Sequence, residues 1–215
     1  MSEIVIKKIV IDLCAGLGGG SEAFMNNPDY RVIRIDNNPL LESVPNMHMI
    51  DLMERGIDVL YEIEELVGDN EIFLILAGPT CTEFSEGFHA PIPTARREGR
   101  VHVPCTKLVQ RCMDLIVDLE PAHWIIENVR GSREWISPII GHQPDQRVGP
   151  FYLWTSEGVP WLHAGGWLPP DFHHTKEVSA WSSDPLRANK RGKWPIELSE
   201  AIRMSLEAPT LERWS

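Results

Sequence analysis

The chain has 215 residues, 43% of them apolar, which is enough to bury one core and form one compact domain. Its formal net charge of -11 excludes a protein that coats nucleic acid over its whole surface, because phosphate binding requires basic surface. The N-terminus lacks the basic start and apolar block of a signal peptide, and no apolar run reaches about 18 residues, so we expect a cytoplasmic protein.

Apolar runs and amphipathic segments alternate along most of the chain. In chain order they predict a strand at 4–12, a helix at 21–26, a strand at 31–36, a helix beginning at 39–44, a helix at 56–66, a strand at 72–77, a helix at 106–119, strands at 124–127 and 149–154, and a helix at 195–207. Residues 157–195 fit no regular structure. The alternation predicts a Rossmann-like α/β fold with an open, mostly parallel sheet and a short irregular C-terminal part, whose ligands bind beyond the carboxyl ends of the strands.

A glycine-rich turn at 12–21 follows the first strand. Such a turn lets the backbone approach a ligand closely and presents helix N-terminal amides to it. Ser21 stands where a dinucleotide-binding fingerprint has its third glycine, so this turn disfavours NAD as the ligand. An NAD-dependent dehydrogenase remains an alternative. Asp36, at the end of the second strand, is placed to hydrogen-bond a ribose, or alternatively to cap the turn that follows it.

Cys81 lies on the loop that leaves the strand at 72–77. A partly exposed thiol among backbone dipoles can ionise and act as a nucleophile, and a buried structural cysteine is the alternative. Glu127 ends the next strand, where a carboxyl can hold or donate a proton to a ring nitrogen, or alternatively pair with Arg130. The cysteine and histidine spacings match no zinc site and no CxxC pair, so we expect neither a metal nor a disulfide.

Three segments resemble, in this order, the motifs of the cytosine-5 DNA methyltransferase family. Residues 12–19 resemble its first motif, residues 78–85 its Pro-Cys loop, and residues 126–129 its Glu-Asn-Val motif. The resemblance covers residues 8–155 and, more weakly, 195–202. It implies a methyltransferase fold that binds S-adenosylmethionine and transfers its methyl group to carbon 5 of cytosine in DNA.

The resemblance also implies a role for individual residues. Cys81 would add to C6 of cytosine, Glu127 would stabilise a protonated N3, Asn128 would orient the loop, and Arg147 would lie on the base side. The cofactor would contact Leu13, Cys14, Ala15, Gly16, Leu17, Gly18, Gly19, Asp36, Asn37, Asp51, Leu52 and Gly78, with Asp51 at the adenine amino group. The target base would be flipped out of the duplex and covered by a mobile loop at 87–99.

Two basic clusters are the candidate DNA contacts, although each can equally be a solvated surface. They contain Arg96, Arg97 and Arg100, and then Arg187, Lys190, Arg191 and Lys193. The tryptophans of the C-terminal third either stack on bases or, more commonly, cap a small core.

The expected organisation has three parts: a catalytic and cofactor-binding domain at 1–155, a reduced target-recognition-like segment at 156–193, and a C-terminal helix at 194–215 that packs back on the catalytic domain. The middle part is too short for a separate base-reading domain, and Thr80 replaces the family's proline. These departures keep two alternatives open, a catalytically weakened regulator that binds DNA or cofactor, and a methyltransferase acting on a free cytosine nucleotide or tRNA. The small size fits a phage enzyme or a restriction-modification enzyme.

Overall fold

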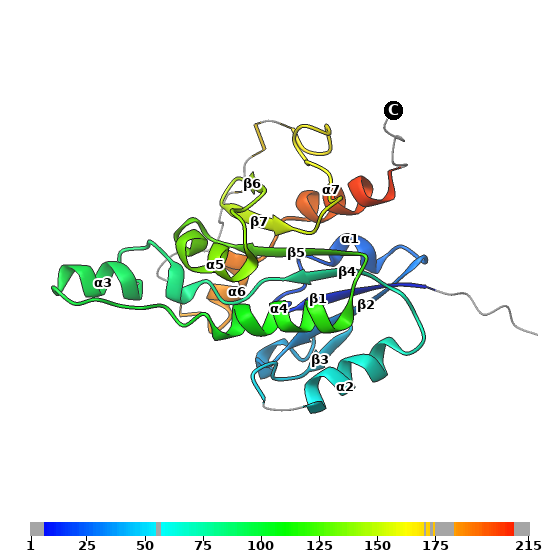
Figure 1. The fold of residues 1–215 in the computed structure, drawn as a ribbon, viewed down its shortest axis with the longest axis horizontal. Helices are drawn as coiled ribbons and strands as arrows, with labels where there is room; N and C mark the ends of the chain where they lie inside the picture. The colour runs from blue at the N-terminus through cyan, green and yellow to red at the C-terminus, as the bar shows by residue number, and fades with distance from the viewer. Residues whose placement is uncertain (1–6, 55–56, 170, 173, 175–182, 209–215) are drawn as a thin grey trace, which may run out of the picture.

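A seven-stranded sheet forms the centre of the protein (Figure 1). The structure is a computed structural model, and it describes residues 7–54, 57–169, 171, 172, 174 and 183–208. The strands are β1 (Lys8–Leu13), β2 (Tyr30–Asp36), β3 (Met47–Met49), β4 (Ile72–Ala77), β5 (His123–Asn128), β6 (Gln146–Val148) and β7 (Phe151–Thr155). Their order in the sheet is β3-β2-β1-β4-β5-β7-β6.

Most strand pairs are parallel. β1 pairs with β2 and β4, β2 pairs with β3, and β4 pairs with β5, all in parallel, whereas β7 runs antiparallel to β5 and β6. The predicted Rossmann-like α/β fold with an open, mostly parallel sheet is therefore confirmed. The chain builds outward from β1 through β2 to β3 and then returns to β4, so the order reverses between β1 and β4. Such a reversal opens a crevice beyond the carboxyl ends of the strands.

Helices cover both faces of the sheet (Figure 1). They are α1 (Glu22–Met25), α2 (Ile57–Val67), α3 (Pro91–Arg97), α4 (Lys107–Leu119), α5 (Arg133–Ile140), α6 (Arg187–Gly192) and α7 (Ile196–Glu207), with short 3-10 helices η1 (Pro39–Leu41), η2 (Thr82–Phe84) and η3 (Arg130–Ser132). The core of one face joins alternate β1 residues such as Ile9 and Ile11 to α2, α4 and α5. The core of the other joins Val10 to Phe24 of α1 and Leu198 of α7. This alternation follows from the two-residue period of a strand.

The helix predicted to begin at 39–44 is wrong. Only the 3-10 turn η1 forms there: Asn38 caps its start by accepting a hydrogen bond from the Leu40 amide, but Pro45 disfavours a helical Val44 and the turn does not continue. The strand β3 follows, which the sequence did not predict. Elements α3, α5, β6 and α6 were also not predicted, and α3 lies inside the segment expected to be a mobile loop.

Several predictions fall partly outside the described residues. These are the start of the strand at 4–12, Gly56 of the helix at 56–66, residues 170, 173 and 175–182 of the segment at 156–193, and the end of the unit at 194–215. Helix α7 packs on α1 and shares the core that contains Val10 of β1. The boundaries of the three predicted parts stay a prediction. None of the helices that the structure describes is both long and apolar enough to span a bilayer.

The C-terminal segment is fastened to the glycine-rich turn. A Cβ atom on Gly19 would lie 2.6 Å from the carbonyl oxygen of Trp194 and 2.7 Å from its nitrogen. One turn into α7, the Ser199 hydroxyl donates to the Gly20 carbonyl at 2.6 Å and accepts from the Ala23 amide at 3.0 Å. Two backbones can therefore touch here only because Gly19 has no side chain.

We predict that Gly19→Ala destabilises the protein by about 1–3 kcal/mol, because the new methyl group overlaps backbone that cannot rotate away. Gly192→Ala is the matched control, since a Cβ there meets nothing within 4 Å. Chemical denaturation of both variants measures the effect. Equal stability of the two variants would contradict the proposed contact.

Candidate active site

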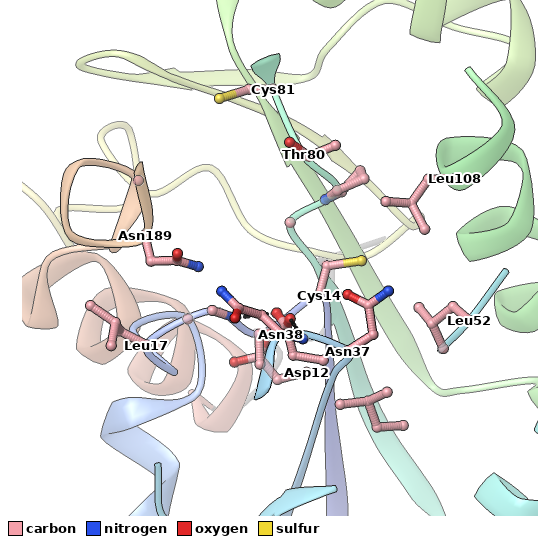
Figure 2. A pocket seen from close by; sticks show the side chains of 18 of the residues that line it. Asp12, Cys14, Leu17, Asn37, Asn38, Leu52, Thr80, Cys81, Leu108 and Asn189 are labelled. Atoms are coloured by element: carbon pink, nitrogen blue, oxygen red, sulfur yellow. Dashed lines mark hydrogen bonds between the residues drawn. The ribbon is translucent and has the colours of Figure 1, made fainter. Parts of the chain in front are cut away.

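A cavity of about 460 Å³ lies beyond the carboxyl ends of β1, β2, β4 and β5. This volume is in the range of small-molecule and cofactor sites. Figure 2 shows Cys81 at one end and Asp12, Asn37 and Asn38 toward the other, while Asn189 reaches in from α6. The predicted site residues that line the cavity are Cys14, Ala15, Gly16, Leu17, Gly19, Asp36, Asn37, Asp51, Leu52, Gly78, Cys81, Glu127 and Lys193.

One wall is the turn between β1 and α1, which is tied to the end of β2. The Gly16 amide donates to Asp36 Oδ2 at 2.9 Å, and the Asn38 amide donates to Asp36 Oδ1 at 3.0 Å. Gly16 has a φ of +54°, a left-handed conformation that a residue without Cβ adopts without strain. The Asp36 carboxylate is thereby held at the cavity, where a carboxylate can accept hydrogen bonds from the hydroxyls of a sugar.

Two residues predicted to contact a cofactor do not line the cavity. Leu13 is fully buried in the core, and its carbonyl accepts a hydrogen bond from the Gly78 amide at 3.1 Å. A Cβ on Gly18 would lie 2.4 Å from the guanidinium carbon of Arg34, so this glycine makes room for a buried arginine. The glycine-rich turn therefore serves packing as well as ligand access.

The opposite wall is mostly apolar. It contains Ile35, Ile50, Leu52 and Leu108, which offer flat surfaces to a ring. Asp51 stands at the rim with an exposed side chain, and its Oδ1 accepts from the Met53 amide at 2.9 Å. A ring between these side chains would have a carboxylate within reach of its edge.

Two contacts, from Asn128 and from Gly131, hold the loop that carries Cys81 in place. The Asn128 side chain is fully buried, and its Nδ2 donates to the Pro79 carbonyl at 2.9 Å. Gly131 packs so tightly on the same loop that a Cβ there would lie 2.1 Å from the Phe84 carbonyl oxygen. The predicted contact of Asn128 with the loop is thus present, while its effect on a reaction stays a prediction.

The surroundings distinguish Cys81 from the other three thiols. The hydrogen bond to the Cys112 thiol, together with burial, raises the pKa of Cys14 well above its ordinary value, so Cys14 stays protonated. Cys112 is fully buried, and Cys105 is exposed away from the cavity. Cys81 is half-buried and lines the cavity, the position that suits a nucleophile.

A buried polar cluster supports the floor of the cavity. The Ser21 hydroxyl donates to Asp12 Oδ2 at 2.7 Å and accepts from Arg34 Nε at 2.9 Å, and Arg34 Nη2 donates to the Gly18 carbonyl at 2.8 Å. Burial raises the pKa of Asp12 from its ordinary value of 3.8 to about 6. Ser21, which replaces a glycine of the dinucleotide fingerprint, therefore links this carboxyl to a cation.

Arg147 is not brought to the cavity. It lies exposed on the edge strand β6, where its Nε donates to the Gly149 carbonyl at 3.0 Å. The sheet order explains the difference, because β7 separates β6 from β5 and its Glu127. The expected position of Arg147 on the base side of the pocket is therefore wrong for this structure.

The second basic cluster lies beside the cavity. Ala188, Asn189 and Gly192 of α6 line it together with Lys193 and Trp194. Lys193 pairs with Glu22 at 2.7 Å, and Lys190 pairs with Asp184 at 2.5 Å, while Arg187 and Arg191 are half-buried. The wall that this segment makes was missed, because no local pattern signals a contact between residues so far apart, such as Ala23 and Ser199, which are separated by 176 positions.

Other lining residues were also missed. They include Gly20, Asn38, Met53, Pro79, Thr82, Asn189 and Trp194. All of these except Asn189 and Trp194 lie within or beside the sequence motifs described above, so their position in the sequence could have identified them. Among the residues that the structure describes, no three His, Cys, Asp or Glu side chains are arranged to hold a metal ion.

Comparison with known proteins gives a distant structural match and no match by sequence. No family profile matches the sequence, and no curated protein matches it. A solved structure from E. coli, described as a candidate DNA modification methyltransferase encoded within a prophage, is similar, with 20% identity and a TM-score of 0.40. The match covers 63% of this chain and 36% of that one, so this chain spans about a third of its length.

We predict that Asp12→Asn gains stability relative to the parent protein as the pH rises from about 4 to above 6. The raised pKa means that the folded protein must ionise a buried carboxyl that the unfolded chain ionises more readily, which costs on the order of 2–3 kcal/mol above pH 6. Denaturation at several pH values measures it. Asp118→Asn, which removes an exposed carboxylate of α4, is the matched control for the same change at an unburied position. A pH-independent difference for Asp12→Asn would refute the buried ionisation.

Proposed function

We propose that this protein is an S-adenosylmethionine-dependent methyltransferase that acts on carbon 5 of cytosine in DNA. The observation that carries the proposal is that Cys81, Glu127 and Asp36 line one continuous cavity. A thiol nucleophile and a carboxyl proton carrier at one end, with a sugar-binding carboxylate at the other, are what such a transfer needs.

The residues at the glycine-rich end fit the proposed cofactor. Asp36 suits the two ribose hydroxyls, the apolar wall of Ile50, Leu52 and Leu108 suits the adenine ring, and Asp51 suits its amino group. The turn from Cys14 to Leu17 is left for the amino-acid portion. When bound, the cofactor supplies an activated methyl group on a sulfonium ion.

At the other end, the Cys81 thiolate would form a bond to C6 of a cytosine that has left its helix. The electrons of the C5–C6 double bond then become available at C5, while Glu127 would hold a proton at N3 and so balance the charge on the ring. Carbon 5 would accept the methyl group, whose bond to the sulfonium sulfur breaks and leaves a neutral thioether. Loss of the C5 proton to water would then restore the C5–C6 double bond and expel Cys81 as a thiolate, and the Asn128 bond to the Cys81 loop would keep the sulfur in line throughout.

DNA would be held by the arm that follows the Cys81 loop. Figure 1 shows α3 projecting from the body of the molecule. Arg96, Arg97 and Arg100 are exposed along it, and the guanidinium of Arg97 lies 3.8 Å from the centre of the Phe88 ring. A projecting basic segment on an acidic protein concentrates the attraction for phosphates next to the cavity.

Transfer of a labelled methyl group tests the proposal. We expect transfer to duplex DNA, with loss of the C5 tritium when that carbon is labelled, and about a thousandfold or greater decrease for Cys81→Ala. Cys105→Ala is the control, because Cys105 is exposed outside the cavity and should keep full activity. Single-stranded DNA, tRNA and dCMP are offered in parallel. If only one of these accepts the methyl group, that molecule and not duplex DNA is the substrate. If the protein binds cofactor or DNA but transfers no methyl group, it is a regulator, the alternative that Thr80 in place of the family's proline supports.

We further predict that replacing Arg96, Arg97 and Arg100 together by alanine weakens DNA binding and flattens its salt dependence. Each lost phosphate contact should reduce the slope of log K against log salt by about 0.9. Binding titrations between low and moderate salt measure the slope. Arg31→Ala, whose side chain bonds the Leu66 carbonyl far from α3, should leave the slope unchanged. An unaltered slope for the triple variant would exclude the arm as a DNA contact.

A further inference from the structure

We propose that Trp194 is a positioning residue for Glu127, an inference that rests on the function proposed above. The indole Nε1 of Trp194 donates a hydrogen bond to Glu127 Oε2 at 3.3 Å. Both residues line the cavity, yet they are 67 positions apart and come from opposite parts of the fold. The C-terminal segment therefore reaches across the sheet edge to touch the carboxyl that would carry the proton.

The donor is rigid. Trp194 is 6% exposed, its backbone rests on Gly19, and its ring atom Cε3 would lie 3.4 Å from a Cβ on Gly20. On another side its ring centre is 6.3 Å from that of Phe151 in β7. An indole confined on these sides has one direction for its N–H, so the hydrogen bond restricts the rotation of the Glu127 carboxyl.

The donor is also neutral. The next residue toward α6, Lys193, directs its ammonium to Glu22 at 2.7 Å, whereas the indole N–H of Trp194 donates to Glu127. An ammonium at the same place would hold the carboxyl in its ionised form by Coulomb attraction. An indole N–H, which does not titrate, orients the carboxyl while leaving it able to take up and release a proton.

Orientation matters more for the reaction than for binding. To hold a proton at N3, the carboxyl must lie near the plane of the cytosine ring, and a carboxyl free to rotate would spend only part of its time there. Trp194 touches Glu127 rather than the reacting ring in this account. Its loss should therefore lower kcat while leaving the affinities for cofactor and DNA nearly unchanged.

The test is Trp194→Phe, which keeps an aromatic ring in the pocket and removes the N–H. We expect kcat for methyl transfer to fall about tenfold, as for loss of one hydrogen bond to a charged group, with dissociation constants for S-adenosylmethionine and DNA within about twofold of the parent. Trp154→Phe is the matched control. Trp154 is also buried and donates from Nε1, to the His142 carbonyl at 3.2 Å, but it does not line the cavity.

A double-mutant cycle separates positioning from general damage. Glu127→Asp withdraws the carboxyl by one methylene and breaks the contact, so adding Trp194→Phe to that variant should cause no further loss of kcat. The same tenfold loss in both backgrounds, or an equal loss in Trp154→Phe, would overturn the inference. If Trp194→Phe does not fold, Trp194→His, which has a ring N–H, is compared with Trp194→Leu, which has none. We then expect a higher kcat per folded molecule for Trp194→His, and equal values for the two variants would also overturn the inference. Absence of transfer by the parent protein would instead refute the proposed function.

Discussion

The backbone contact between Gly19 and Trp194 is the constraint on which the cavity depends. A single Cβ on Gly19 would place atoms 2.6 Å apart, and the C-terminal segment would have to move away from the turn. With it would move Asn189 and Lys193, which close one side of the cavity, and the indole that bonds Glu127. Gly19 thus does for packing what Gly16, the first glycine of the turn, does for ligand access.

The reversal of strand order between β1 and β4 determines which residues line the cavity beside the Gly19–Trp194 contact. Because β1, β2, β4 and β5 are parallel, Cys14, Asp36, Cys81 and Glu127 all follow or end strands at one edge of the sheet. The loops at that edge are held by bonds to neighbouring strands, such as that from Asn128 to the Pro79 carbonyl. The Asp36 carboxylate and the Cys81 thiol therefore share one cavity, and both are half-buried.

The sequence predicted the parallel half of the fold and the residues at its strand ends, because a buried strand followed by a glycine or a polar residue is a local pattern. Asp36, Cys81 and Glu127 were found in this way, and all three line the cavity. Arg147 was misplaced because a motif only half visible carried no information on sheet order. α6 and Trp194 were missed because their role comes from a contact with Gly19, and such distant contacts leave no periodic pattern.

The two basic clusters show why charge alone did not separate DNA contacts from internal structure. Arg96 and Arg97 lie on the projecting helix α3 and Arg100 follows it, and all three are exposed, as a phosphate-binding surface requires, although Arg100 already pairs with Glu98. In the second cluster, Lys193 and Lys190 are paired with Glu22 and Asp184, and the same segment lines the cavity. A cation already engaged by a carboxylate gains less from a phosphate, since the existing pair must first be broken. The electrostatic attraction for DNA would therefore come mainly from Arg96 and Arg97, while residues 187–194 would shape the cavity in which the chemistry would occur.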